Sequence, residues 1–340
     1  MSELRIGVAG GGRMGRERAR CLRASGARIV AVYDIEPARG ASFAADCATV
    51  SVAEFDELLA CDAVFLCTPP NARVPMALKC VERGVPFFAE KPIALDAVAA
   101  EPVLRALERA PVVHSVGYMN RWRTSVRHAK QALEGLTILG MTAFWVNRPY
   151  RVPWWLDPST SGGPHNEQAT HLFDLSRHLC GDIAQVIALG DRTDRDATAS
   201  QTVASCLRFE SGALGTILYS CASTEKEIGM RIFTREGSVT FSTWDFTLVE
   251  NTITHALPIA EAEDVFLTET GAFLQAVRSG VTDSNASGWA DAMKTQRVVD
   301  AAAASITGQR QRGSVPIVPS DAAGPLTIAR LHITRPRMED

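Results

Sequence analysis

Short apolar runs alternate with helical patterns through the first third of the chain, and this alternation restricts the fold most. Runs such as IVAVY and AVFLC are apolar at every position, which indicates strands buried on both faces. The predicted strands are Arg5–Ala9, Arg28–Tyr33, Ala63–Cys67, Pro86–Ala89 and Val112–Val116. The predicted helices are Met14–Ala24, Val52–Ala60, Arg73–Arg83 and Leu95–Arg109. Strand–helix–strand units of this length predict a doubly wound parallel α/β sheet, a Rossmann fold, with right-handed crossovers.

A glycine-rich turn joins the first of these strands to the first helix. It matches G-x-G-x-x-G, a pattern that binds dinucleotides when a strand precedes it and a helix follows. Gly10 allows the tight turn, Gly12 the close approach of a pyrophosphate, and Gly15 the packing of helix on strand. Arg13 and Met14 complete the predicted cofactor-binding turn.

Asp34 ends the second predicted strand, nineteen residues after Gly15. A carboxylate at this place accepts hydrogen bonds from ribose hydroxyls and repels a 2′-phosphate, so NAD is predicted as cofactor. An alternative is that Asp34 caps the following helix. Arg39 is near enough in sequence to keep NADP as a second option.

The pattern changes after about Tyr118 and predicts a second domain. Helices are expected at Thr124–Leu133, at about His165–Leu179, and at 265–279 and 288–306. Strands are expected at Ile138–Val146, Gln185–Leu189, Ser200–Phe209, Ala213–Cys221, Gly229–Thr234 and Ser238–Ser242. Glycine-containing turns join neighbouring strands as in hairpins. We therefore expect a Rossmann domain over residues 1–120 and, over 121–340, an α/β domain with an open, mostly antiparallel sheet.

Composition excludes several classes of function. The net charge of −3 gives no basic surface for nucleic acid, and no segment is long enough to span a membrane. The start of the chain leaves no room for a signal peptide. The eight cysteines form no Cys-x-x-Cys pair, so reduced, buried thiols are expected in place of zinc sites or disulfides. These features predict a cytoplasmic protein.

Several motifs resemble the glucose–fructose oxidoreductase and inositol dehydrogenase family, Gfo/Idh/MocA. They are Thr68–Asn71, Gly84 with Ala89–Pro92, Gly117–Arg121, Gly162–Gly163, and Glu167-x-x-x-His171-x-x-Asp174, in the order in which the family carries them. Two positions depart from the usual pattern: Arg73 stands where the family often has His, and Glu167 where it usually has Asp.

The resemblance implies an NAD(P)-dependent dehydrogenase or reductase that acts on a hydroxyl carbon of a sugar, amino sugar or inositol. It implies that the flat face of the second sheet forms a homodimer or homotetramer contact, and that the Lys91–Pro92 bond is cis. Lys91 would lie near the reacting hydroxyl. The cofactor contacts that it adds to the glycine turn and Asp34 are Thr68, Pro69, Asn71, Glu90 and Lys91.

Proton transfer requires a group that exchanges its proton near neutral pH, which points to His171. On a helical wheel Glu167, His171 and Asp174 fall within a narrow arc. We predict His171 as general acid or base, Lys91 as hydrogen-bond donor to the reacting hydroxyl, and Glu167 as the group that orients His171 or binds a substrate hydroxyl. Lys91 and His171 could exchange roles. Alternatives are a buried structural histidine and a metal site; no third ligand is evident, so no metal is predicted.

Aromatic and basic side chains flank this predicted cleft. Aromatic rings suit the apolar faces of sugar rings, and arginine suits anionic groups. The substrate contacts predicted beside Lys91, Glu167 and His171 are Arg121, Trp154 and Trp155, with Tyr150 and Arg151 nearby. Packing in the core is the alternative reading of the tryptophans.

The sequence therefore predicts an NAD-dependent oxidoreductase that transfers a hydride between nicotinamide and a secondary hydroxyl or ketone carbon of a sugar, amino sugar or cyclitol. Two alternatives remain: an enzyme that retains NAD and cleaves glycosides, and a non-catalytic NAD-binding regulator.

Overall fold

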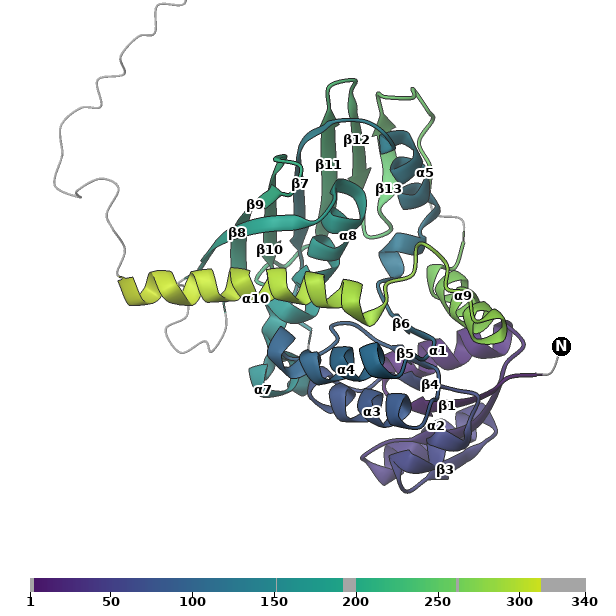
Figure 1. Cartoon of the computed structure of the whole chain (residues 1–340). Coiled ribbons are helices and arrows are strands. Elements are labelled where there is room, and N and C mark those ends of the chain that lie inside the picture. Colours follow the sequence, from purple (N-terminus) through teal and green to yellow (C-terminus); the bar gives the residue numbers. More distant parts are fainter. Residues whose placement is uncertain (1–2, 151, 192–199, 261–262, 313–340) are drawn as a thin grey trace, which may run out of the picture.

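The first sheet is parallel and has six strands in the order β3-β2-β1-β4-β5-β6 (Figure 1). A computed structural model describes residues 3–150, 152–191, 200–260 and 263–312, with side chains to residue 306. The strands are β1 (Arg5–Ala9), β2 (Arg28–Tyr33), β3 (Val50–Val52), β4 (Ala63–Leu66), β5 (Phe87–Ala89) and β6 (His114–Val116). Strand order reverses between β1 and β4, and such folds bind ligands at the carboxyl ends of these strands.

Helices cover both faces of this sheet because alternate strand residues are apolar on each side. Val64 and Leu66 face a core with α3 (Pro70–Glu82) and α4 (Ala97–Arg109). Phe65 faces the other core with α1 (Arg13–Ala24), α2 (Pro37–Cys47) and, from the far end of the chain, α9 (Val265–Ser279).

The second sheet has seven strands in the order β13-β12-β11-β7-β10-β9-β8 and is mostly antiparallel. Its strands are β7 (Ile138–Val146), β8 (Ile183–Gly190), β9 (Thr202–Phe209), β10 (Leu214–Ser220), β11 (Glu227–Thr234), β12 (Ser238–Ser242) and β13 (Thr247–Asn251). Within this second sheet, the described residues pair in parallel only between β7 and β10, and the other neighbouring strands are antiparallel. The predicted fold class, a Rossmann sheet with a second mostly antiparallel sheet, is confirmed.

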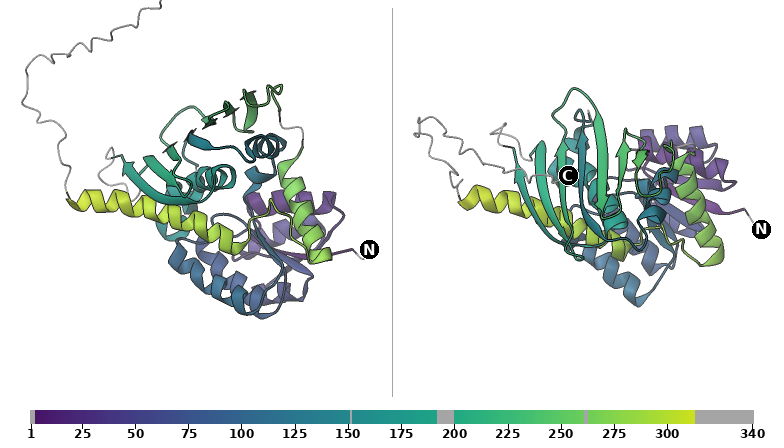
Figure 2. Two further views of the ribbon diagram at one scale, coloured as in Figure 1. Left: turned by 45° about the horizontal axis from the view of Figure 1, so that its top comes forward. Right: turned by 90° about the horizontal axis from the view of Figure 1, so that it is seen from above.

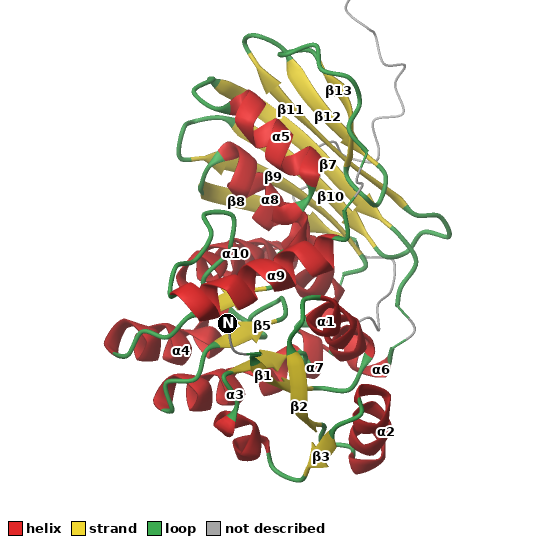
Figure 3. Cartoon of the chain, turned by 90° about the vertical axis from the view of Figure 1, so that its right-hand side faces the viewer, coloured by secondary structure: helices red, strands yellow, loops and turns green. Residues whose placement is uncertain are grey.

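One face of the second sheet is covered by helices α5 (Thr124–Leu133), α8 (Thr170–Cys180) and α10 (Trp289–Arg312) (Figure 3). The long α10 contacts both halves of the molecule: it packs on α4, which covers the first sheet, and on β8 of the second sheet (Figures 1 and 2). We call the first sheet with its helices the Rossmann unit, or first unit, and the second sheet with its helices the second unit. Helix α9 likewise returns to pack Phe273 and Leu274 on the first sheet. Two elements beyond the predicted boundary at residue 120 thus stabilise the Rossmann unit. In the described ranges, no helix is long and apolar enough to cross a bilayer.

The local predictions failed where elements are short or weakly patterned. Helix α2 was missed because its small residues (PARGASFAADC) form only a narrow apolar face, although proline at the first position is a helix-start signal. The predicted helix Val52–Ala60 is wrong over its first part: Val50–Val52 pairs with β2, and only Phe55–Ala60 is helical, as a 3₁₀ helix. Strand β13 was also missed. The predicted helix from His165 begins with a π-helical turn (His165–Ala169) before α8.

Candidate active site

The glycine turn has the shape that a dinucleotide requires. At Gly10, φ is +97°, and a Cβ there would lie 2.8 Å from the carbonyl of Cys67. A Cβ on Gly15 would lie 1.9 Å from the Gly10 oxygen, whereas one on Gly12 would meet nothing within 4 Å. Gly12 precedes α1 and offers no side chain to cap it. The first N–H groups of α1, including those of Arg13 and Met14, therefore have no side-chain cap beside the open space at Gly12, which fits a pyrophosphate.

Asp34 lies beside this turn at the end of β2. Its Oδ2 accepts from Gly11 N at 2.7 Å, and its Oδ1 accepts from Glu36 N at 2.9 Å. Arg39 donates to both oxygens, from Nε and Nη2, at 2.7 Å each. Burial acts to raise the pKa of Asp34, but the Arg39 guanidinium and these two backbone donors outweigh it and lower the pKa. The carboxylate is therefore ionised at neutral pH.

Thr68, Pro69 and Asn71 form the turn from β4 into α3, with Asn71 in its first helical turn. Arg73, which is 2% exposed, links this turn to the one at Lys91–Pro92. Its guanidinium donates to the carbonyl oxygens of Thr68 and Pro92. Its Nε has no hydrogen-bond partner among the described residues, and no carboxylate pairs with it directly. Arg73 thus holds the Thr68 turn to the Lys91–Pro92 turn.

Lys91 and Glu167 meet at the carboxyl end of β5. The Lys91 ammonium donates to the Glu167 carbonyl oxygen at 2.8 Å and forms an ion pair with Glu167 Oε2. The two side chains keep 15% and 10% of their surface exposed. The Lys91–Pro92 bond is cis, as expected. A lysine from the Rossmann unit and a glutamate from the second unit are thus joined, 76 residues apart in sequence.

His171 lies in the first turn of α8 and is 7% exposed. Its ring stacks on Trp145 of β7, with 5.6 Å between centroids, and meets the edge of Tyr118 at 6.5 Å. Burial, together with the positive charges of Lys91 and Arg123, holds the pKa of His171 well below 6.5. The imidazole is therefore neutral at neutral pH.

The π-helical turn alters the predicted stripe. Glu167 lies in that turn and is bound to Lys91, whereas His171 follows in regular α-helix and stacks on Trp145. In the described structure no hydrogen bond joins Glu167 to His171, so the expected orienting contact is absent. Asp174, one turn further, pairs with Arg121.

Two predicted site residues, Glu90 and Arg121, pair with other charges inside the protein. Glu90, predicted to bind cofactor, is 4% exposed, and its Oε1 accepts from Arg18 Nε at 2.8 Å inside a buried network with Glu269. Arg121, predicted to contact substrate, is 5% exposed and pairs with Asp174 and Asp291, the latter at 2.6 Å. Both side chains therefore lie in buried ion pairs, and their predicted contacts with cofactor and substrate remain predictions.

Trp154 and Trp155 lie on the helix Pro153–Leu156 after β7. Trp155 is 2% exposed and meets Tyr150 edge to face at 5.2 Å, and Trp154 packs against the core of the second unit. Arg151 lies outside the described residues.

Four buried polar atoms without a partner in the described chain lie on Gln168, on or directly after β7, and on the helix Pro153–Leu156. Gln168, the neighbour of Glu167, is 2% exposed and accepts from the Tyr219 hydroxyl at 2.9 Å through Oε1. In the described chain its Nε2 has no partner, and the same holds for Nε1 of Trp145 and Trp155 and for Oδ1 of Asn147. Sequence reasoning missed Gln168 and Trp145; the Glu-Gln pair in the Glu-x-x-x-His motif was the signal available for Gln168.

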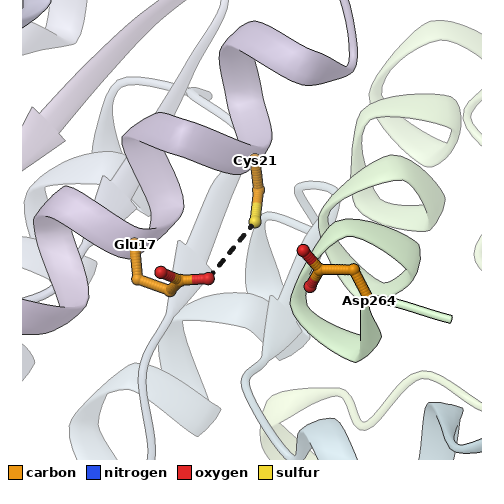
Figure 4. Close-up of side chains that lie close together, drawn as sticks. All are labelled: Glu17, Cys21 and Asp264. Carbon is orange, nitrogen blue, oxygen red and sulfur yellow. Dashed lines mark hydrogen bonds between the residues drawn. The ribbon is translucent and has the colours of Figure 1, made fainter. Parts of the chain in front are cut away.

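A second cluster of side chains resembles a metal site, but its carboxylates already pair with an arginine. Glu17 and Cys21 of α1 face Asp264 at the start of α9, with ligand atoms within 4.8 Å of one another (Figure 4). Arg20 donates to both carboxylates. The guanidinium supplies the positive charge that a metal would bring, so we assign this cluster to helix docking.

Comparison with known proteins gives similarities along most of the chain. Residues 4–118 match the oxidoreductase family with NAD-binding Rossmann fold (GFO_IDH_MocA), and residues 135–240 match the GFO/IDH/MocA C-terminal domain. Inositol 2-dehydrogenase 1 of Saccharopolyspora erythraea is 30% identical over 224 residues, which cover 63% of this chain and 66% of that protein. Inositol 2-dehydrogenase of Rhizobium meliloti is 24% identical over 339 residues, 91% of this chain and 98% of that protein.

Solved structures share the whole fold. A levoglucosan dehydrogenase in complex with NADH and levoglucosan has a TM-score of 0.80 at 20% identity, over 90% of this chain and 98% of that one. GenD2 from gentamicin A biosynthesis, in complex with NAD, has a TM-score of 0.78 at 21% identity, over 91% and 96%.

Proposed function

Because the chain belongs to the Gfo/Idh/MocA family of NAD-binding oxidoreductases, we propose that it interconverts a secondary hydroxyl and a ketone on a sugar, amino sugar or cyclitol. The observation that carries this proposal is the pairing of Lys91 with Glu167 beside a neutral His171. It lies where strand β5 of a dinucleotide-binding sheet ends, which is where such folds bind their ligands.

The glycine turn and Asp34 would hold the dinucleotide, whose nicotinamide accepts or returns the hydride. Lys91 would donate a hydrogen bond to the reacting oxygen and stabilise the negative charge that develops there. Glu167 fixes the Lys91 ammonium through its carboxylate and its backbone oxygen. Neutral His171 would accept the hydroxyl proton during oxidation and return it during reduction. Lys91 and His171 in exchanged roles would give the same net reaction.

Two features support a substrate rich in oxygen atoms. Nε2 of Gln168 and Nε1 of Trp155 are buried donors that lack an acceptor in the described protein, and hydroxyl oxygens would supply one. Relatives at 24–30% identity act on inositol by name.

A substrate panel tests the proposal. We expect NADH to form when the protein is mixed with NAD and a member of a set of inositols, anhydrosugars, hexoses and amino sugars. NADH binding with no turnover across the whole panel would contradict it and favour a regulatory role. Glycoside cleavage without net NADH release would favour the NAD-retaining hydrolase.

We also propose that the protein is a cytoplasmic homodimer or homotetramer. All eight cysteines are free, which suits a reducing compartment. The face of the second sheet opposite its helices exposes Ile187, Leu189, Leu214, Leu218 and Phe233. The strand register places these residues on one side of the sheet, on strands β8, β10 and β11, with β9 and β7 between them. A second copy would cover this apolar surface.

A further inference from the structure

The carboxylate of Asp34 has no acceptor capacity left for a ribose. A carboxylate offers about four lone-pair positions on its two oxygens. Gly11 N and Arg39 Nε occupy Oδ2, and Glu36 N and Arg39 Nη2 occupy Oδ1, all at 2.7–2.9 Å. In sites of this kind the ribose hydroxyls of the cofactor donate hydrogen bonds to the acidic residue. To bind Asp34 they must therefore displace one of these four donors.

Arg39 is the donor that can leave. The Gly11 and Glu36 N–H groups belong to the glycine turn and to the start of α2, which are fixed by the sheet and helix that they join. The Arg39 side chain keeps 39% of its surface exposed. Its Nη1 already lies 2.9 Å from Glu36, a second carboxylate that is mostly exposed. Arg39 can thus move from Asp34 to Glu36 with its charge still paired.

The same pair changes the meaning of Asp34 for a phosphorylated ribose. Asp34 alone would repel a 2′-phosphate, and this repulsion is the usual basis of NAD preference. Here a bidentate guanidinium neutralises the carboxylate. An arginine on the rim of a ribose site is also the group best suited to bind phosphate oxygens.

We propose that Arg39 determines cofactor specificity and makes the site accept both NAD(H) and NADP(H). With NAD(H), Arg39 yields Asp34 to the ribose hydroxyls and pairs with Glu36. With NADP(H), Arg39 stays on Asp34, and Nη1 leaves Glu36 for the 2′-phosphate. This inference goes beyond the proposed function, because it adds a second cofactor and names the residue that admits it.

Direct binding tests the proposal without a substrate. NADH and NADPH are titrated by fluorescence into the full-length wild type, Arg39→Met, Arg39→Lys and Glu36→Gln. The matched control is Arg23→Met, an arginine of α1 whose Nη1 donates to the Asp46 carbonyl oxygen. Circular dichroism monitors folding.

We expect the wild type to bind NADPH within about 30-fold of its NADH affinity, a discrimination smaller than an unpaired carboxylate would give. Arg39→Met should weaken NADPH binding by about 10–100-fold and leave NADH binding equal or tighter, since only the phosphate loses its cationic partner and the neutralisation of Asp34. Arg39→Lys keeps the charge without the fork and should fall between the two. Glu36→Gln should tighten NADPH binding, and Arg23→Met should leave the affinities for NADH and NADPH unchanged.

Two results would overturn the inference: a wild type that binds NADH but not NADPH, or an Arg39→Met variant with an unchanged NADPH-to-NADH ratio. A wild type that binds neither NADH nor NADPH would instead contradict the dinucleotide site and the proposed function with it. Cofactor binding without turnover of any substrate would contradict only the proposed function and leave this inference intact.

Discussion

Arg73 is a single residue on which two parts of the candidate site depend. It is a buried cation whose hydrogen bonds go to two backbone carbonyls, one in the Thr68 turn and one beside Lys91. Burial lowers the pKa of Arg73, while the charges of Glu90 and Glu167 act to raise it. A buried charge supported in this way stabilises one relative position of the two turns, and a turn displaced by about 1 Å can cost about 10²-fold in rate.

The change Arg73→Met should lower turnover by about 10–100-fold, because the Lys91 turn loses its link to the Thr68 turn. Arg73→Lys, which can still donate to one carbonyl, should retain more activity. Turnover at saturating NAD and substrate is the measurement. Lys79→Met is the control, since Lys79 lies on the same helix but is exposed and paired with Asp56. Wild-type turnover in Arg73→Met would refute this role.

His171 should remain neutral well below the pH at which histidine ordinarily titrates. Burial and two nearby cations lower its pKa, so the free energy of unfolding that it contributes is present above about pH 6.5 and is lost as pH falls through the lower folded value. Nitrogen-15 NMR of the imidazole should show the neutral ring at pH 6. A His171 signal that titrates near pH 6.5 would contradict the burial described here.

For single residues, the sequence predicted which positions belong to motifs better than it predicted the partners of each side chain. Gly10, Asp34, Lys91 and His171 are predictable because each sits in a motif with fixed spacing. Glu90 pairs with Arg18, 72 residues away, and Arg121 pairs with Asp291, 170 residues away. No local pattern in the sequence shows such contacts.

At the scale of elements, α9 is fastened to the Rossmann unit by a buried charge network. Arg18 of α1 donates to Glu90 at 2.8 Å and to Glu269 of α9 at 2.6 Å. Burial raises the pKa of Glu269 to about 7, against the lowering effect of Arg18, and in the described chain its Oε1 lacks a partner. The folded state therefore holds this proton more tightly than the unfolded state does.

It follows that stability should fall as pH rises from about 4.5 through about 7, because over that interval the folded chain binds the extra proton. Glu269→Gln should reduce this fall by on the order of 1–3 kcal/mol in unfolding free energy. Urea unfolding at pH 5 and pH 8 measures it. An equal pH dependence in the variant and the wild type would rule out Glu269 as its source.

Elements with strong patterns were predictable and weakly patterned ones were not. The fully apolar strands of the first sheet and the alternating strands of the second follow directly from burial on two faces or one. The π-helical turn was not foreseen, because Gly162 and Gly163, with φ of +76° and +89°, are followed by a segment whose composition is ordinary for an α-helix. That turn separates Glu167 from His171.

At the scale of the molecule, the second sheet has one covered and one open face. Residues that lie on the open face include Ile187, Leu218 and Phe233. We expect Leu218→Lys with Ile187→Lys to shift the protein toward monomers in light scattering, since a buried lysine pair opposes a close apolar contact. Val98→Lys is the control, an exposed apolar residue on α4 of the other unit. A monomeric wild type, or an unchanged oligomer in the double variant, would argue against this interface.

The division into two sheets was predictable from the change of pattern after Tyr118, but the path of the chain between them was not. Trp289 and Phe273 fill cores of the first unit from the end of the chain. Each lies on an amphipathic helix, and such a helix can bury its apolar face against either sheet. Only the assembled structure therefore shows which sheet the helix packs on.

We propose that the site joining Lys91, Glu167 and His171 carries out the proton transfer that accompanies hydride transfer. The most direct test compares turnover of Lys91→Ala and His171→Ala with the wild type on the best substrate of the panel, with NADH binding measured in parallel. We expect each variant to lose about 10²–10⁴-fold in kcat while it still binds NADH. Wild-type kcat in either variant would contradict the role given to that residue, and wild-type kcat in both would contradict the site.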